Sequence, residues 1–406
     1  MKAKVFWIIN QYSSTLDTGF GGRSYYIAKN LANLGHKVYL ISANHHHLLR
    51  NNNNIDKEFS SIDIDGFTFV RIPVYWYKAA HDKKRVINWF VFSWRCMFLT
   101  QVIQDKPNII IASSPSPIVF FGARYLASKF HAKLVFEVRD IWPLTLIELG
   151  GYSVHHPFII MLRWIEKLAY KRSDLIISNL PYFYKHMVKF GEDINKFSWI
   201  PNGIDVSEMQ TAELLPKNIL NKIPQNKFIV GYIGTFGAVN ALDSLIDAAS
   251  LLNDDSISFV LVGHGKERSK LLERVKNMNL KNVTIMESIN KKQVQSMLHN
   301  FDVCYLGMAK CPLFHYGVAP NKLPEYLFSK KPIIYSIESG DYLPVDDACA
   351  GISIPAEDSN SIVDAIIRLR NMSDLKLKEL GDNGRAYAIK NHDYKNLSIK
   401  LSKFVS

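Results

Sequence analysis

Short runs of apolar residues alternate along the chain with longer segments in which apolar and polar positions recur at helical spacing. This alternation is typical of parallel sheets whose two faces are covered by helices. In the first half, the pattern predicts helices that include residues 22–34 and 158–171, and Gly35 follows the first of them, where a left-handed cap is expected. The predicted strands of this half are 5–9, 38–42, 67–72, 109–112, 134–137 and 175–178.

A second and independent series of strands and helices begins at residue 228. Its predicted strands are 228–233, 259–262, 283–286, 303–306 and 332–335. Between the two series, residues 206–226 contain Pro216, Pro224 and polar positions without a clear strand, which is typical of a linker. The chain is therefore predicted to be an α/β protein with two doubly wound, Rossmann-like domains facing each other across a cleft.

The expected boundaries follow from these two series. Residues 1–205 form the N-terminal domain, 206–226 the linker and 227–385 the C-terminal domain, and residues 386–406 form a C-terminal helix that returns to the N-terminal domain. The first apolar run is too short for a secretion signal and leads into polar residues, so it is interpreted as a core strand.

The stretch 86–103 comes nearest to a membrane span, but Arg95 interrupts it and a bilayer needs about 20 apolar residues. Two interpretations remain open: a half-buried helix, or a helix that lies in the membrane interface. The second would place four aromatic side chains in the lipid: Trp89, Phe90, Trp94 and Phe98. Because basic residues precede them, the segment 78–103 is a candidate contact with an anionic membrane surface.

The composition of the chain narrows the classes of function and partner to be considered. The 406 residues are 48% hydrophobic, as in folded proteins, and 49 Lys and Arg against 37 Asp and Glu give a net charge of +12. This surplus favours anionic partners, but the basic residues form no nucleic-acid-binding module. Four cysteines without a CxxC pair indicate a reducing cytosol: Cys96, Cys304, Cys311 and Cys349.

Glycine-rich loops follow three predicted strands, at the carboxyl ends where ligands of parallel sheets gather. In the C-terminal domain, the loop 231–237 contains Gly234, Thr235 and Gly237, and the loop 262–267 contains Gly263 and Lys266. Both have the form of a phosphate cradle, although a tight strand-to-helix turn would use the same glycines.

The N-terminal domain carries a third glycine-rich loop, in which Gly21 and Gly22 precede Arg23. The pattern is not GxGxxG, and the second strand ends in Ser-Ala-Asn at 42–44 instead of the acidic residue that binds an NAD ribose. A dehydrogenase is therefore disfavoured.

The segment 314–327 combines a helix start with charged residues. Asn321 is a candidate helix cap, and Lys322 and Glu325 are three residues apart, so they share one helical face. The alternative is an ordinary surface ion pair, which contributes no more than about 0.5 kcal/mol.

Two further patterns resemble metal-binding motifs, but neither is expected to form a metal site. Asp63-Ile64-Asp65 matches a DxD motif that can hold Mn²⁺ or Mg²⁺ in enzymes of another fold, but Gly66 follows it, which predicts a turn. His45–His47 precede the run Asn51–Asn54, a low-complexity surface loop without the scaffold that makes histidines converge on one ion.

Several motifs, taken in order, resemble family 4 glycosyltransferases of the GT-B fold over nearly the whole chain. They are Gly-Gly-Arg at 21–23, Glu-Val-Arg-Asp-Ile-Trp-Pro at 137–143, Pro-Asn-Gly-Ile-Asp at 201–205, the glycine-rich loops at 231–237 and 262–265, and Pro-Asn-Lys at 320–322 with Glu325. Within the family, the Arg-Asp-Ile-Trp-Pro and Pro-Asn-Lys-Leu segments look like the bacterial O-antigen and capsule subgroup, which includes N-acetylfucosamine transferases.

The resemblance implies retaining transfer of a sugar from a nucleotide diphosphate donor to a lipid-diphosphate-linked saccharide at the cytoplasmic membrane face. Lys322 and Lys266 would stabilise the departing diphosphate, and Glu325 would bind the ribose. The first glutamate of the family's paired motif is replaced by Gly317, whose backbone N–H would take over the sugar contact. No metal or other cofactor is implied.

On the acceptor side, Arg139 and Asp140 follow a strand of the first domain directly. Asp140 either orients or deprotonates the acceptor hydroxyl, or it caps a helix or ties a loop, and the sequence leaves these roles open. Two alternatives to a transferase remain: a binding scaffold without turnover, and a nucleotide-sugar epimerase with the same two-domain architecture.

Overall fold

The computed structural model describes residues 2–50, 58–79, 82–252 and 254–406, which fold into two compact units. The first unit comprises Met1–Pro201 together with Tyr394–Ser406, and the second comprises Asn202–Asp393. Two α/β units with mostly parallel sheets confirm the predicted fold class.

The observed unit boundaries differ from the expected ones at two places. The expected linker 206–226 is part of the second unit and contains two short helices, α7 (Val206–Gln210) and α8 (Lys217–Leu220). The Asp205 carboxylate caps α7 by accepting from Ser207 N at 3.1 Å, a local signal that the two prolines obscured. The returning segment begins at Tyr394, not at 386.

An eight-stranded sheet forms the centre of the first unit, with the order β3-β4-β2-β1-β5-β6-β7-β8. All neighbouring strands are parallel except β3, which pairs with β4 in the antiparallel direction. The strands are β1 (Val5–Ile9), β2 (Lys37–Ala43), β3 (Ser60–Ile64), β4 (Phe67–Ile72), β5 (Ile109–Ser113), β6 (Lys133–Val138), β7 (Leu175–Ser178) and β8 (Phe197–Trp199).

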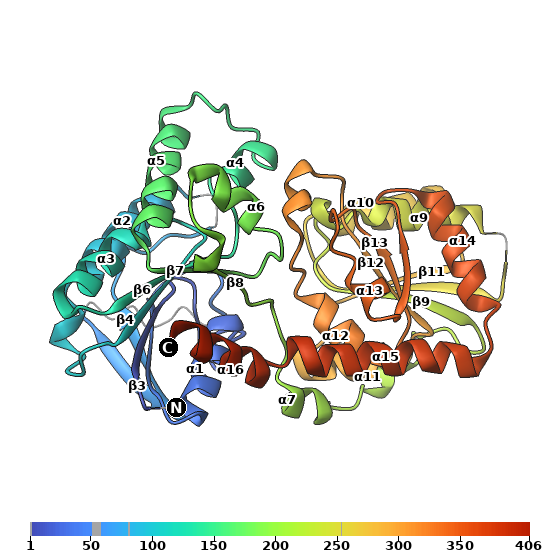
Figure 1. Ribbon diagram of the computed structural model, residues 1–406. Helices are drawn as coiled ribbons and strands as arrows, with labels where there is room; N and C mark the ends of the chain where they lie inside the picture. The colour runs from blue at the N-terminus through green and yellow to red at the C-terminus, as the bar shows by residue number, and fades with distance from the viewer. Residues whose placement is uncertain (1, 51–57, 80–81, 253) are drawn as a thin grey trace. The chain divides into compact units, whose positions relative to one another are not determined.

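Helices cover both faces of this sheet (Figure 1). On one face lie α1 (Arg23–Asn33) and α16 (Tyr394–Val405), and Gly35 follows α1 with φ of 87°, as predicted for its cap. On the other face lie α2 (Lys83–Cys96), α3 (Val119–Phe130) and α5 (Pro157–Arg172). The shorter helices are η1 (Leu99–Gln101), α4 (Leu144–Glu148), α6 (Tyr184–Met187), η2 (Val188–Phe190) and η3 (Ile194–Lys196).

The stretch 86–103 is not one continuous helix, because α2 ends at Cys96 and η1 follows. Trp89 is buried and its Nε1 donates to the Tyr12 hydroxyl at 2.6 Å, so it is unavailable to a membrane interface, whereas Phe90, Trp94 and Phe98 are exposed. Among the described residues, no helix combines the length and apolar character that crossing a bilayer requires.

The DxD pattern lies in a β-hairpin. Asp63 and Ile64 end β3, which the sequence analysis did not predict, and Asp65 and Gly66 form the two-residue turn to β4. Their φ angles of 49° and 82° fit the turn that Asp-Gly favours between antiparallel strands. Asp63 accepts from the Thr68 hydroxyl at 2.6 Å, and Asp65 from the Tyr25 hydroxyl, so both carboxylates have structural partners.

A six-stranded parallel sheet forms the centre of the second unit. Its order β11-β10-β9-β12-β13-β14 corresponds to the 3-2-1-4-5-6 arrangement of dinucleotide-binding folds. The strands are β9 (Phe228–Ile233), β10 (Ile257–Val262), β11 (Val283–Met286), β12 (Val303–Gly307), β13 (Ile333–Ser336) and β14 (Gly351–Ile354), the last of which was not predicted.

The helices of the second unit pack on both faces of this sheet. A large apolar core joins β9, β10 and β12 to α9 (Leu242–Leu251), α10 (Arg268–Asn277) and α14 (Ser359–Arg370). The long helix α15 (Asp374–His392) runs beside α12 (Lys322–Phe328) (Figure 1), and its Gly381 approaches the Lys330 backbone too closely for a Cβ. The remaining elements are η4 (Ala238–Asn240), η5 (Lys291–Gln293), α11 (Val294–His299), η6 (Pro312–Tyr316) and α13 (Pro344–Asp347).

The C-terminal helix α16 completes the core of the first unit. Leu397, Leu401 and Val405 are buried in the same cluster as the strand residues Phe6 and Ile8. Leu401→Ala should therefore destabilise the first unit by about 2–5 kcal/mol, because it removes apolar contacts and leaves a cavity. Hydrogen exchange resolved along the chain should show faster exchange in β1 and α1 and unchanged exchange in β9 and β10.

Leu375→Ala on α15 is the matched control, because this leucine is 81% exposed and its truncation removes little buried surface. Equal losses of protection in the two variants, or a loss confined to the second unit, would contradict the assignment of α16 to the first core.

Candidate functional site

The strand order of the second unit reverses between β9 and β12, and this switch point is where open α/β sheets bind ligands. Three chain segments meet around the carboxyl end of β9. They are the loop 234–237 directly after β9, the loop 263–267 after β10, and the segment that runs from η6 into α12. They contain all of the donor-binding residues proposed from the sequence.

The loops after β9 and β10 are joined through their backbones. Gly234 N donates to Val262 O at 2.9 Å, Phe236 N to His264 O at 2.9 Å, and Glu267 N to Phe236 O at 3.0 Å. A Cβ on Gly263 would stand 1.9 Å from Gly234 O. Glycine at this position is therefore required for the two loops to approach each other.

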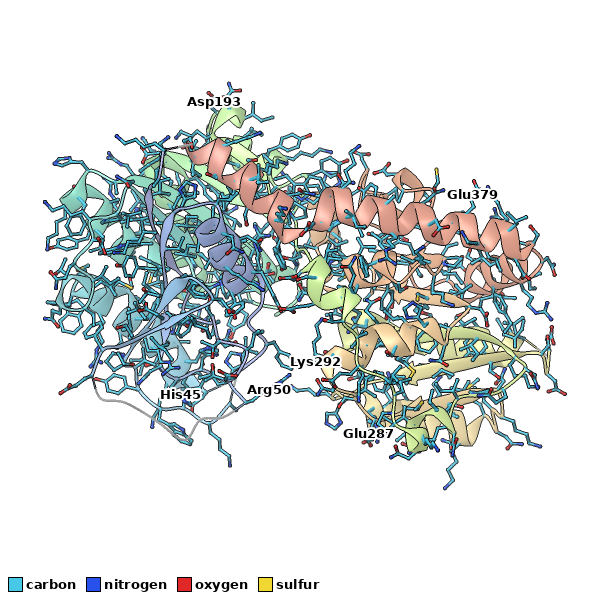
Figure 2. The ribbon with its side chains drawn as sticks, turned by 90° about the horizontal axis from the view of Figure 1, so that it is seen from below. His45, Arg50, Asp193, Glu287, Lys292 and Glu379 are labelled. Carbon is cyan, nitrogen blue, oxygen red and sulfur yellow. The ribbon has the colours of Figure 1, made fainter. Side chains whose placement is uncertain are left out.

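Several backbone N–H groups of these loops are available to a ligand. Within the described residues, the N–H groups of Thr235, Gly237 and Gly265 donate no hydrogen bond, and Thr235 is exposed. Lys266 is also exposed and lies two residues before α10. Glu287, which is labelled in Figure 2, follows β11. Its carboxylate pairs with Arg268 at 2.7 Å. Unpaired N–H groups beside a lysine are suited to an anionic ligand.

Lys322 extends from the start of α12 to the loop after β9. Its Nζ donates to Asn240 Oδ1 at 2.7 Å and lies 4.9 Å from the centre of the Tyr232 ring. A Cβ on Gly234 would stand 2.0 Å from Lys322 Cε, so this glycine leaves room for the lysine side chain. The Tyr326 hydroxyl, one turn further along α12, bonds both N and O of Ile233 and holds the helix against β9.

Burial changes the proton affinity of Lys322. Desolvation lowers its pKa to about 8, and the carboxylate of Glu325 opposes the shift only in part. Within the described part of the chain, no carboxylate forms an ion pair with Lys322. An anion that entered the site would supply the missing negative charge and favour the protonated lysine.

The structure corrects two expectations about this segment and excludes one of the alternatives left open. Asn321 does not cap α12 with its side chain; its Oδ1 accepts from Asn202 Nδ2 at 2.9 Å. Glu325 pairs with Lys291, not with Lys322, because the lysine is drawn toward Asn240 on the neighbouring loop. The N–H of Gly317 donates to Phe314 O at 2.8 Å and closes the turn after η6, so it is not free for a sugar.

Asn202 was not among the predicted site residues, although it stands in one of the motifs. Its Nδ2 also donates to Ala319 O at 2.8 Å, which ties the start of the second unit to the segment before α12. The Asn202 carbonyl bonds the ring of buried His392 at 2.7 Å, and burial lowers the pKa of that histidine to about 4. Asn240 and Tyr326 were missed as well, because neither lies in a glycine-rich pattern.

In the first unit, Arg23 is a structural residue. It is buried at the start of α1, where its Nε bonds Glu137 Oε1 at 2.8 Å and a second guanidinium nitrogen bonds Pro201 O. Ser113 Oγ donates to the other Glu137 oxygen at 2.5 Å. Burial alone would raise the pKa of Glu137, but Arg23, Arg139 and the Ser113 hydroxyl together lower it.

Arg139 and Asp140 directly follow β6, at the carboxyl edge of the sheet of the first unit. Arg139 N donates to Ser114 Oγ at 2.8 Å, which fixes the chain direction after the strand. Desolvation by the surrounding chain raises the pKa of Asp140, and the neighbouring Arg139 opposes this shift. Gly21 and Gly22 precede α1 with φ of 64° and 80°.

The described residues contain no group of three or more His, Cys, Asp or Glu side chains that could hold a metal ion. His45 and His46 are buried and bond the carbonyls of Tyr77 and Ser13 at 2.8 and 2.9 Å, and burial lowers the pKa of His46 to about 4. These histidines therefore support the loop after β2. The run Asn51–Asn54 lies outside the described residues.

Comparisons with known proteins agree with this arrangement. Residues 19–208 match the model of Glycosyltransferase Family 4, and residues 227–372 match the model of Glycosyl transferases group 1. The matches correspond to the two α/β units. The chain belongs to the family 4 glycosyltransferases with the GT-B fold.

One relative and two solved structures with a similar fold illustrate the similarity. The chain is 24% identical to the putative colanic acid biosynthesis glycosyl transferase WcaI of Escherichia coli over 80% of this chain and 81% of WcaI. Sucrose-phosphate synthase from Thermosynechococcus elongatus has a similar fold, with a TM-score of 0.76, 16% identity and 98% coverage of both chains. Anabaena HepE, solved with UDP and glucose, gives a TM-score of 0.67 at 13% identity, with 98% coverage of both.

The pKa of Lys322 predicts how anion binding depends on pH. Since the free lysine loses its proton near pH 8, the affinity for a diphosphate anion should fall about thirtyfold between pH 7 and 9.5, in step with the protonated fraction of the lysine. In Lys322→Arg the guanidinium stays charged across this range, so the decrease should disappear. Calorimetric titrations at several pH values measure both dependences.

Lys276→Arg on the exposed face of α10 is the control and should retain the decrease of the unmodified protein. An equal decrease in Lys322→Arg would show that another group controls the pH dependence.

The ion pair of Arg23 predicts a stability change. Arg23→Leu leaves the Glu137 carboxylate buried without its main partner, which should cost about 3–5 kcal/mol. The double variant Arg23→Leu/Glu137→Leu should recover part of this loss, because no buried charge remains. Urea denaturation measures the cost; equal stability of the single variant and the unmodified protein would contradict a structural role.

The same ion pair predicts a pH dependence of stability. Since the pKa of Glu137 is lowered in the folded protein, its contribution to the free energy of unfolding is present at neutral pH and is lost as the pH falls through the lowered value.

Proposed function

We propose that this protein is a retaining glycosyltransferase of surface polysaccharide assembly, in the O-antigen or capsule class. It moves a hexosyl or N-acetylhexosaminyl group from a nucleotide diphosphate sugar to a lipid-diphosphate-linked saccharide at the cytoplasmic face of the membrane. The single observation that carries the proposal is the position of Lys322 over Gly234, where the lysine has no acidic partner among the described residues and adjoins unpaired N–H groups.

The donor diphosphate is suited to the switch point of the second unit. Its phosphates would accept from the N–H groups of Thr235 and Gly237 and from the ammonium of Lys322, with Lys266 on the adjacent loop. Glu325 would turn from Lys291 to the ribose hydroxyls. HepE was solved with UDP and glucose, which supports a nucleotide diphosphate sugar as the donor.

The reaction needs the chain mainly as a stabiliser of charge. The bond between the anomeric carbon and the diphosphate oxygen breaks, and the acceptor oxygen bonds that carbon from the same face. The departing phosphate oxygen takes the acceptor proton. Negative charge on the diphosphate grows in the transition state, where fixed N–H groups and the lysine stabilise it without reorganisation. Asp140 would orient the acceptor hydroxyl, and no metal takes part.

The acceptor class rests on the relatives and on the resemblance of the motifs. WcaI is named as a putative glycosyl transferase of colanic acid biosynthesis, and a second relative, 22% identical over 60% of this chain, is encoded in the cps region of Klebsiella pneumoniae. Surface polysaccharides of this kind are built on lipid carriers, so the acceptor would be held close to a membrane.

A panel of UDP-, GDP- and dTDP-sugars, screened by thermal shift, should identify one donor class. With that donor and a lipid-linked acceptor, transfer should persist in EDTA and decrease at least about 100-fold in Lys322→Ala, as for loss of one charge-stabilising group. Lys276→Ala, an exposed change on α10, should retain full activity.

Other results would redirect the proposal. Undiminished transfer by Lys322→Ala would exclude this lysine from the site. Conversion of the donor sugar without any acceptor would favour an epimerase, and the absence of binding to every nucleotide sugar would favour a scaffold without turnover.

A further inference from the structure

The exposed aromatic side chains of the described residues all lie in the first unit. The second unit exposes only aliphatic side chains and Met278 among its large hydrophobic residues. The exposed aromatic residues are Phe20, Tyr75, Trp76, Phe90, Trp94, Phe98, Tyr125, Tyr152 and Trp164. Such an uneven distribution indicates that one unit has a partner for these rings.

Several of these residues belong to α2, α3 and α5, the helices on one face of the sheet (Figure 1), or follow α2 directly. The helices share an apolar cluster that includes Trp89, Ile118 and Leu162, and Gly122 of α3 approaches Ser93 of α2 too closely for a Cβ. Their outer sides remain uncovered. The exposed apolar side chains are Ile87, Phe90 and Trp94 on α2, Phe98 after it, Tyr125 on α3, and Ile160 and Trp164 on α5.

The helices that form this face are strongly basic. Together with η2, the three helices contain eleven Lys and Arg residues and a single acidic residue, Glu166, which is buried. The basic residues are Lys83, Lys84, Arg85, Arg95, Arg124, Lys129, Arg163, Lys167, Lys171, Arg172 and Lys189. Within the described residues, neither Arg163 nor Lys167 forms an ion pair, so their charge is available to an anionic partner.

A hollow of about 410 Å³ opens between α5 and η2 on this face. It is lined by three cations and three apolar side chains: Arg163, Lys167, Lys189, Ile160, Trp164 and Phe190. The two walls are joined beneath it, because the buried Glu166 carboxylate on α5 bonds His186 of α6 at 2.7 Å. Glu166 also accepts from the Tyr170 hydroxyl at 2.8 Å. The hollow is therefore held by the fold.

We propose that this face docks the first unit onto an anionic lipid bilayer, with the α5–η2 hollow holding a lipid phosphate headgroup. The exposed rings of α2 and α5 enter the interfacial layer, where Trp side chains are favoured, while the cations face the headgroups. The inference rests on the proposed function, since a lipid-linked acceptor would bring the enzyme to such a surface. It extends the membrane contact expected at 78–103 to α5 and removes Trp89 from it.

Charge-reversal variants test the electrostatic contribution to membrane binding. The full-length protein is mixed with vesicles of phosphatidylcholine and phosphatidylglycerol, and bound protein is measured by sedimentation. Arg163→Glu/Lys167→Glu should bind at least about tenfold more weakly, since each basic residue near an anionic surface contributes substantially to the attraction. Lys276→Glu/Lys281→Glu on the second unit makes the same change in net charge at exposed positions and should bind normally.

Removal of the exposed aromatic rings tests the apolar contribution to membrane binding. Phe90→Ser/Trp94→Ser should also weaken vesicle binding several-fold, whereas Leu251→Ser/Leu375→Ser, which removes exposed apolar side chains of the second unit, should not. All four positions are exposed, so each variant is expected to fold, and circular dichroism verifies this.

Equal sedimentation of the Arg163→Glu/Lys167→Glu protein and its control would overturn the proposal. Equal binding to vesicles of phosphatidylcholine alone would remove its charge dependence, and binding of inorganic phosphate without any vesicle binding would assign the hollow to a soluble anion. Binding of a nucleoside diphosphate is measured on the same variants. If the unmodified protein binds the nucleotide but not the vesicles, this inference alone is overturned. If the unmodified protein binds no nucleotide, the proposed function is overturned.

Discussion

The candidate site depends on a backbone contact that only glycine permits. The loops after β9 and β10 join through hydrogen bonds at Gly234 and Phe236, and a Cβ on Gly263 would collide with the Gly234 carbonyl. A Cβ on Gly234 would occupy the space of the Lys322 side chain. Because glycine has none, Lys322 can lie against the loop and reach Asn240. One constraint therefore positions both kinds of anion-binding group, the N–H groups and the ammonium.

The two units use charge in opposite ways. In the first, the buried Arg23 guanidinium is paired with Glu137 through Nε and with the Pro201 carbonyl through Nη1, so it stabilises the junction of β6 and α1, while its Nη2 has no hydrogen-bond partner. In the second, desolvation lowers the pKa of Lys322 to about 8, and the hydrogen-bond partner of this lysine is the neutral amide of Asn240. A charge that the fold leaves uncompensated is the more suitable one for binding an anion.

Much of the architecture was predictable, because buried parallel strands are continuous apolar runs and their helices have a regular apolar period. The strands that were missed, β3, β8 and β14, are short and lie at sheet edges, where half-exposed positions lack that signal. The glycine-rich loops and Lys322 were found from their position after strands. Asn202, Asn240 and Tyr326 were not, since no local pattern distinguishes a polar side chain that bonds a distant loop.

The sequence by itself determined the α/β class, the family and the loops that carry the site, because each depends on residues close together in the chain. The tertiary structure decided which partner each charged or polar side chain takes. Glu325 pairs with Lys291, Asn321 bonds Asn202 and the Gly317 N–H closes a turn, and each of these contacts differs from the expectation. Hydrogen bonds and ion pairs are made with the nearest group in space, and that group is set by the packing of elements far apart in the sequence.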